Sequence, residues 1–168
     1  LDLAPTANPE DSLDLSDSLA VSGVVSGSTV YTGYGDDTVS VIGSVNASTI
    51  YGGTGNDVIA ITGVASGVFD LGEGVNSLAA GTLSAATVTA GSSADTVAVS
   101  SSISGSNINL GAGDNVITAL GVTSSTLQGG SGNDSISFGT GGLIASSVGA
   151  GSGADTVSVA GNVSGSTV

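Results

Sequence analysis

The sequence contains no lysine, arginine or histidine, so its 14 acidic residues give a formal net charge of −14. A chain without fixed positive charge cannot neutralise phosphate, which excludes a conventional nucleic-acid-binding protein and argues against docking on an anionic membrane. Cysteine is also absent, so no disulfide stiffens the chain. Because His, Cys, Lys and Arg are all missing, the familiar catalytic constellations and zinc sites cannot be built, and we expect no enzyme.

Long hydrophobic runs are missing as well. No stretch approaches the roughly 18 apolar residues of a membrane-spanning helix, so we expect no membrane insertion. The chain has instead 29 glycines among 168 residues, and 39% hydrophobic residues that are mainly Val, Ile, Leu and Ala. Frequent glycine disfavours helices, whereas β-branched residues suit strands and the apolar content argues against disorder. The composition therefore favours an all-β fold.

A glycine-rich turn followed by alternating apolar residues recurs seven times. Its leading glycines are 20, 19, 19, 20, 19 and 21 residues apart, and a second file of apolar residues keeps the same period. A repeat of this length indicates a solenoid, because one turn-and-strand unit cannot bury its own apolar face until units stack. The seven copies are Gly33–Val39, Gly53–Ile59, Gly72–Leu78, Gly91–Val97, Gly111–Ile117, Gly130–Ile136 and Gly151–Val157, and the second file is Val30, Ile50, Val68, Val88, Ile108, Leu127, Val148 and Val168.

These repeats predict an all-β, parallel, right-handed β-solenoid (a β-helix or β-roll) of about seven to eight coils of 19–21 residues, over residues 23–168. Residues 1–22 contain both prolines and five acids and are predicted to form a linker or an N-terminal cap. Residues 163–168 repeat residues 25–30 letter for letter. Since a solenoid needs polar caps, we expect it to continue beyond Val168 or to associate with another copy, end to end or side by side.

Nine acidic residues follow residue 22, and eight of them lie in the glycine turns. Stacking places neighbouring turns about 5 Å apart, so the carboxylates repel one another. The chain has no cation to offset this repulsion, which predicts one from solution. Glycine carbonyls together with Asp or Asn oxygens suit Ca²⁺, with Mg²⁺ as second choice. A metal-free solenoid, in which Asp or Asn hydrogen-bonds its own backbone as an Asx turn, stays open as the alternative.

Two of the turns match a nine-residue pattern in full. Gly52–Ala60 and Gly129–Ser137 both read G-G-x-G-x-D-x-U-x, where U is a large apolar residue. These segments resemble the calcium-binding nonapeptide of the RTX (repeats-in-toxin) family. In the other five copies the first glycine is replaced, Ser93 replaces another glycine, and Asn76 and Asn115 replace the Asp. With one motif per coil, the chain is most similar to the single-sided repeats of giant bacterial RTX adhesins and S-layer-type surface proteins.

The resemblance implies a row of several Ca²⁺ ions between adjacent coils. The implied side-chain ligands are Asp37, Asp57, Asn76, Asp95, Asn115, Asp134 and Asp155. The implied carbonyl ligands come from the turn glycines Gly33, Gly35, Gly53, Gly55, Gly72, Gly74, Gly111, Gly113, Gly130, Gly132, Gly151 and Gly153. Sites at Asn76, Ser93 and Asn115 carry less charge, so weaker binding is expected there.

Calcium binding of this kind is coupled to folding, because the ligand shell does not exist in the unfolded chain. Calcium is scarce in the cytosol and plentiful outside, so we expect a secreted protein that folds outside the cell. The expected function is that of a calcium-stabilised structural segment of a cell-surface protein: an S-layer, an extracellular filament or an adhesin stalk. The alternative is a calcium-dependent ice-binding (antifreeze) region, which the regular Ser-Thr pairs at 28–29, 48–49, 125–126 and 166–167 keep open.

Overall fold

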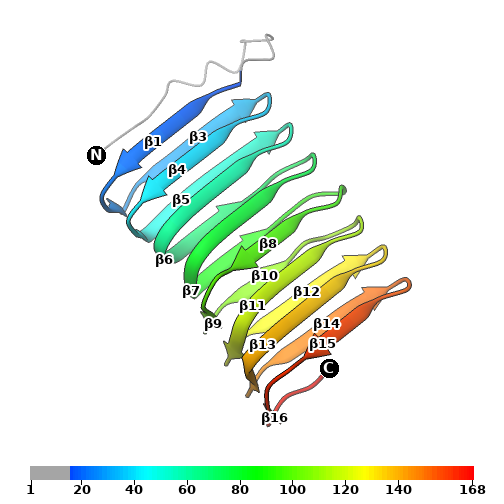
Figure 1. Cartoon of the computed structure of the whole chain (residues 1–168). Helices are drawn as coiled ribbons and strands as arrows, with labels where there is room; N and C mark the ends of the chain where they lie inside the picture. The colour runs from blue at the N-terminus through cyan, green and yellow to red at the C-terminus, as the bar shows by residue number, and fades with distance from the viewer. Residues whose placement is uncertain (1–15) are drawn as a thin grey trace.

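The computed structural model describes residues 16–168 as a parallel β-solenoid of about seven coils of about 20 residues, without a helix in that range (Figure 1). The predicted fold class is therefore confirmed. The strands are β1 (Ser18–Ser22), β2 (Val25–Ser26), β3 (Thr29–Tyr34), β4 (Thr38–Ile42), β5 (Val45–Thr54), β6 (Val58–Asp70), β7 (Ser77–Thr89), β8 (Thr96–Val99), β9 (Ser102–Ser104), β10 (Asn107–Asn109), β11 (Val116–Thr123), β12 (Thr126–Ser131), β13 (Ser135–Ile144), β14 (Ser147–Ser152), β15 (Thr156–Val159) and β16 (Val163–Ser164).

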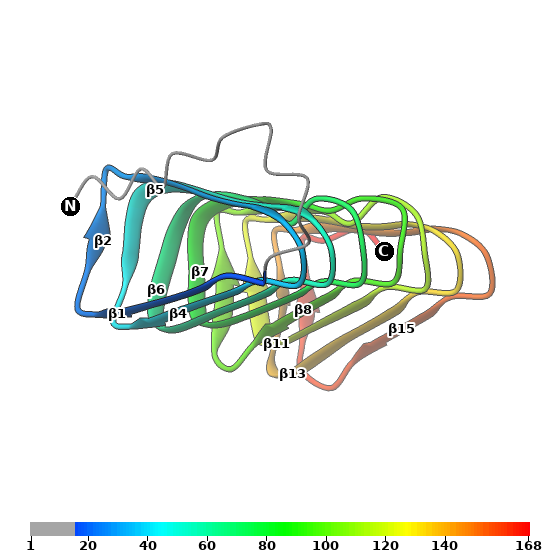
Figure 2. The same cartoon turned by 90° about the horizontal axis from the view of Figure 1, so that it is seen from above.

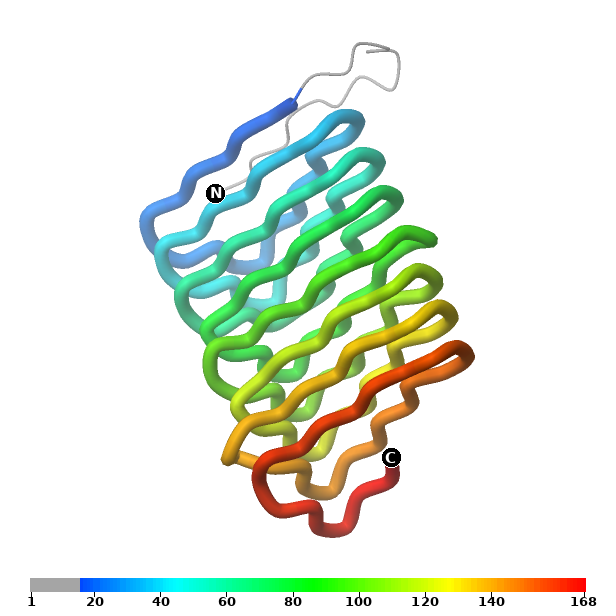
Figure 3. Tube along the Cα trace, turned by 45° about the vertical axis from the view of Figure 1, so that its right-hand side comes forward, coloured from blue at the N-terminus to red at the C-terminus, as the bar shows by residue number. Residues whose placement is uncertain are grey.

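Each coil has two long sides and one short side, and equivalent sides of successive coils pair in parallel. One long side, which we call the front sheet, has the order β1-β4-β6-β7-β8-β11-β13-β15. The opposite side, the back sheet, contains β3, β5, β10, β12 and β14 together with the ends of β6 and β7. The coils follow one another as flattened loops (Figures 2 and 3). The glycine turns connect the back sheet of each coil to its front sheet, so they stack along one edge.

Side chains along the front strands alternate between the interior and the solvent. In β4, Val39 and Val41 are buried, whereas Thr38 and Ile42 are exposed. The register then places Val39 on Ile59, and Ile59 on Leu78, so that each interior residue packs on its equivalent in the next coil. The result is a continuous core of Val, Ile and Leu along the whole stack. The predicted period-2 strands after each turn are thus confirmed.

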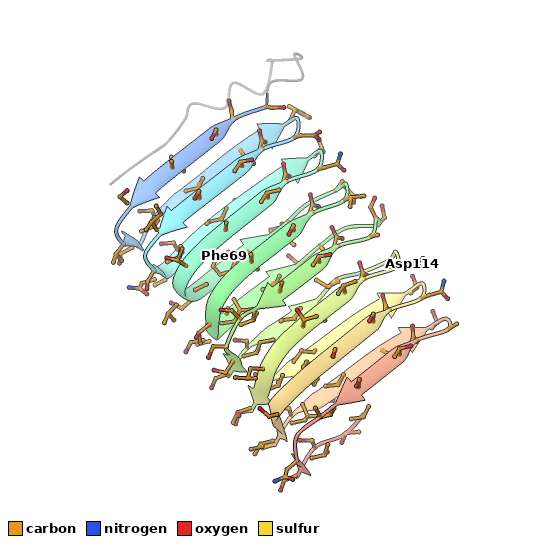
Figure 4. All side chains as sticks on the ribbon, in the orientation of Figure 1. Phe69 and Asp114 are labelled. Atoms are coloured by element: carbon orange, nitrogen blue, oxygen red, sulfur yellow. The ribbon has the colours of Figure 1, made fainter. Side chains whose placement is uncertain are left out.

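The second predicted file of apolar residues needs one correction. Ile50 pairs with Phe69 and not with Val68, and Phe69 pairs in turn with Val88. Phe69 is fully buried between the two sheets (Figure 4), whereas Val68 is 39% exposed. The cause is a coil that is one residue shorter: Val45 pairs with a residue 20 positions ahead, but Ser48 pairs with one 19 positions ahead. A fixed offset of 20 residues holds up to this shift and fails after it by one residue.

β1 pairs in parallel with β4 over its whole length, so the sheet already includes Ser18–Ser22. The greater part of the predicted N-terminal linker or cap, residues 1–15, lies outside the described residues. Within residues 16–168 there is no helix long and apolar enough to cross a membrane.

The register shift predicts which of two adjacent residues supports the core. Phe69→Ala removes a fully buried ring and should lower the free energy of unfolding by about 3–5 kcal/mol. Val68→Ala, its matched control, changes a side chain on the outer surface and should cost less than about 1 kcal/mol. Denaturant titration of both variants in the same buffer measures the difference. An equal or larger loss in Val68→Ala would show that the register is wrong.

Candidate functional site

The stacked glycine turns form one edge of the solenoid, at which Asp114 is labelled in Figure 4. Their backbones lie in register: Gly33 pairs with Gly53, and Gly130 pairs with Gly151. Gly130 has a φ of 118°, and a Cβ there would collide with the carbonyl oxygen of Gly111 in the preceding coil. The turns approach one another too closely for side chains, which explains why glycine recurs at these positions.

The last residue of each turn, which we call the rung residue, points into the turn and not out of it. The six rung residues up to Asp134 are at most 2% exposed, and Asp155 is half-buried. The predicted stacking of these side chains is therefore confirmed. They lie in the protein interior, however, and not along the outer edge where sequence reasoning placed them. The rung residues are Asp37, Asp57, Asn76, Asp95, Asn115, Asp134 and Asp155.

The rung residues form one continuous hydrogen-bonded ladder. The backbone N–H of Asp37 donates to Oδ1 of Asp57 at 2.9 Å, and the backbone N–H of Asp57 donates to Oδ1 of Asn76 at 2.8 Å. The same bond is repeated through each later rung to Asp155. Because the chain turns here, no backbone carbonyl of the next coil faces this N–H. The side-chain oxygen takes the place of that carbonyl and satisfies a buried donor.

At the two Asn rungs the second side-chain atom is also satisfied. Asn76 Nδ2 donates to the carbonyl oxygens of Gly72 at 3.3 Å and Gly74 at 3.0 Å, within its own turn. Asn115 Nδ2 donates to the carbonyl oxygen of Gly129 at 3.2 Å, in the next coil. The rung side chain is therefore surrounded by carbonyl oxygens, which accept hydrogen bonds and donate none.

At the Asp rungs the equivalent atom is an oxygen, and it has no partner. Oδ2 is buried without a hydrogen bond in Asp37, Asp57, Asp95 and Asp134. A Cβ placed on Gly52 would lie 2.6 Å from Oδ2 of Asp57 and 2.5 Å from the carbonyl oxygen of Leu71, so both oxygens border one small space. Oxygens that face each other without a proton or a cation between them are unfavourable in the interior.

Burial also shifts the ionisation of these carboxyl groups. Loss of solvation raises the pKa of Asp57 and of Asp95 to about 6, against an ordinary value of 3.8. The backbone N–H groups that donate to Oδ1 lower the pKa in both cases but do not compensate. Burial likewise raises the pKa of Asp37. In the absence of a cation these side chains resist ionisation near neutral pH.

The donor set of the ladder fits a hard cation. Every candidate ligand is an oxygen, which suits Ca²⁺ or Mg²⁺ and not the softer transition metals. No three acidic side chains converge on one point in the described part of the chain, so each Asp rung offers one carboxylate and the remaining ligands must be carbonyls or water. Gly72 and Gly74 do direct their carbonyl oxygens at a rung side chain. For the other predicted glycines, and for the seven rung residues, a role as metal ligand stays a prediction.

An outer file of polar side chains precedes the rung residues by one position, and the sequence interpretation missed its role. Oδ1 of Asp36 accepts a hydrogen bond from the backbone N–H of Asn56, and Oδ1 of Asn56 accepts one from Val75. Asp114 and Asn133 repeat the arrangement. All four side chains are exposed, so they join the turns from outside. The recurrence of Asp or Asn before a rung residue was the available signal.

A ladder of serines at the far end of the back sheet was also missed as a structural element. The backbone N–H of Ser106 donates to Oγ of Ser125, and that of Ser125 donates to Oγ of Ser146, both at 3.1 Å. All three serines are buried. Like the rung residues, they supply a side-chain acceptor where the backbone turns. A neutral hydroxyl does this without leaving an unpartnered charge, so the chain itself contains a metal-free counterpart of the Asp/Asn ladder.

Comparisons with protein-family models, with curated proteins and with solved structures find no match. The site is therefore interpreted from its own geometry.

The raised pKa values predict how stability depends on pH in metal-free buffer. Since the folded pKa of about 6 exceeds the unfolded value of 3.8, folding favours the protonated carboxyl. This contribution is fully present below pH ~4 and is lost as the pH rises through ~6. The double variant Asp57→Asn/Asp95→Asn should show a weaker pH dependence than the parent, measured as the denaturation midpoint from pH 4 to pH 8. Identical slopes would contradict the shifts.

Proposed function

We propose that the Asp rungs bind Ca²⁺ and that the protein is a calcium-stabilised structural segment of a cell-surface protein. The observation that carries the proposal is the set of four buried, unpartnered carboxylate oxygens in a chain with no lysine, arginine or histidine. Since no side chain can supply the missing charge, it must come from solution. A divalent cation between Oδ2 and the neighbouring carbonyl oxygens removes both the desolvation penalty and the repulsion between rungs.

Calcium is favoured over magnesium by the irregular oxygen environment. Ca²⁺ accepts six to eight oxygens in flexible geometry, whereas Mg²⁺ requires a near-ideal octahedron and keeps several waters. The two turns Gly52–Ala60 and Gly129–Ser137, which resemble the RTX nonapeptide, each contain one of the four unpartnered Asp rungs. The resemblance and the orphaned oxygens, which are independent observations, therefore point to the same positions.

The ladder makes calcium binding a part of folding. Its oxygens converge only when neighbouring coils are stacked, so the unfolded chain offers no site of similar affinity. A cation that binds only the folded state stabilises it by about 2.7 kcal/mol per site at 100 times the dissociation constant. Extracellular calcium modules function with dissociation constants of about 10⁻⁴–10⁻³ M. A protein of this kind remains unfolded at cytosolic calcium and folds after secretion.

A structural role agrees with the shape and surface of the rod. Its outer faces carry mainly Ser, Thr, Ala and Val, and repeated coils give a long, regular surface. One shallow depression of ≈ 430 Å³ on the front sheet is lined by small residues that include Ala60, Ala79 and Ala98, with no acid among them. Such a surface suits an S-layer, a filament or an adhesin stalk, in which the segment acts as a spacer.

The proposal predicts a large effect of calcium on thermal stability. At about 5 mM Ca²⁺ the four sites together should raise the melting temperature by roughly 20 °C over chelated protein, since 1 kcal/mol is worth about 2–4 °C at this size. Circular dichroism at the β-sheet minimum follows the transition, and Mg²⁺ at the same concentration should give a smaller rise.

The matched control is Asp36→Asn, which removes one exposed carboxylate of the outer file and keeps its acceptor oxygen. It should leave the calcium response unchanged. Equal melting temperatures with calcium and with chelator in the parent protein would refute the proposal.

A further inference from the structure

The seven turns fall into two classes according to the residue five positions before the rung. Both Asn rungs are preceded at that distance by leucine, and no Asp rung is. The Asp rungs have a small side chain or none at the same position. The residues are Thr32, Gly52, Ala90, Gly129 and Ala150 for the Asp rungs, and Leu71 and Leu110 for the Asn rungs.

This position lies directly beside the rung side chain. A Cβ on Gly52 would be in contact with Oδ2 of Asp57, and a Cβ on Gly129 would be in contact with Oδ2 of Asp134. In each case the carbonyl oxygen of the equivalent residue in the next coil borders the same space. The backbone at Gly52 and Gly129 has no positive φ, so glycine is not required there by conformation. What glycine provides is room next to an unpartnered oxygen.

At the Asn rungs neither the room nor the unpartnered atom exists. Leu71 and Leu110 are completely buried. Nδ2 of Asn76 and of Asn115 already donates to the carbonyl oxygens that surround it. The buried side-chain atoms without a partner are confined, among residues 16–168, to the Asp class. An amide N–H thus occupies the position at which an Asp rung requires a cation.

We infer that the ladder contains two kinds of rung, and that the residue five positions earlier determines which kind forms. This inference rests on the proposed function. An Asp rung beside a small residue holds a Ca²⁺ ion, and an Asn rung beside leucine is closed by its own amide and holds none. The metal sites are therefore interrupted at Asn76 and Asn115, where adjacent coils associate without calcium.

A purely steric explanation of the leucines makes a different prediction. Leu71 lies between Gly52 and Ala90 in the stack, so alternation of large and small residues alone accounts for good packing. In that case the number of bound ions does not depend on residue 76, and the Asp/Asn choice is incidental. Counting ions separates the two explanations.

The experiment converts one rung of each kind and counts bound calcium by equilibrium dialysis with elemental analysis. Leu71→Ala/Asn76→Asp reproduces the pair Ala90 and Asp95, and it should bind one ion more than Leu71→Ala, which carries the same cavity without the new carboxylate. Asp57→Asn should bind one ion fewer than the parent. Its melting temperature in metal-free buffer should rise, because the amide supplies the donors that the carboxylate lacks.

The outcomes distinguish this inference from the function on which it rests. If the parent binds no calcium, the proposed function fails. If the parent binds calcium but neither conversion changes the number of ions, calcium binding stands and the two-rung inference is overturned. If Leu71→Ala/Asn76→Asp does not fold, Asp57→Asn decides: one ion fewer with a higher metal-free melting temperature supports the inference, and an unchanged count refutes it.

Discussion

The structure depends on how a buried N–H at a tight turn is satisfied. In a parallel solenoid each strand pairs with its equivalent one coil further on, but at the turn the backbone carbonyl of the next coil faces away. The rung side chain supplies the missing acceptor through Oδ1, coil after coil. An Asp or Asn at this position is thus required by the backbone, before any question of metal arises.

The choice between Asp and Asn then determines the chemistry of the site. Both provide Oδ1, and they differ in the atom that faces the turn carbonyls. In Asn that atom is a donor and the rung is complete. In Asp it is an acceptor, so the rung needs a proton or a cation. The chain uses the costlier residue at most rungs and carries no Lys, Arg or His to offset it. A requirement for an external cation makes folding conditional on the surroundings of the protein.

The sequence was sufficient to predict the architecture, because a solenoid repeats one local pattern. Glycines at a spacing of 19–21 residues and alternating apolar residues fix the turns, the strands and the stacking. It was not sufficient where a coil loses a residue. The shift that places Phe69 in the core, and not Val68, arises in a segment without a strong periodic marker, so no sequence spacing reports it.

The candidate site could be predicted as a set of residues but not as a geometry. Charge and spacing identified the seven rung residues, and the structure stacks them as expected. Sequence could not show that these side chains point inward, since a residue at the end of a turn can face either side of the chain. Nor could it assign hydrogen-bond roles to Asp36 and Asn56, because these depend on the neighbouring coil.

The central claim, that cations complete the Asp rungs, is tested most directly by a high-resolution crystal structure of the calcium-loaded protein with anomalous data. The account predicts anomalous peaks about 2.3–2.6 Å from Oδ2 of Asp37, Asp57, Asp95 and Asp134, and none at Asn76 or Asn115. Water at all four positions, or Oδ2 within hydrogen-bond distance of a carbonyl oxygen with no ion nearby, would contradict it.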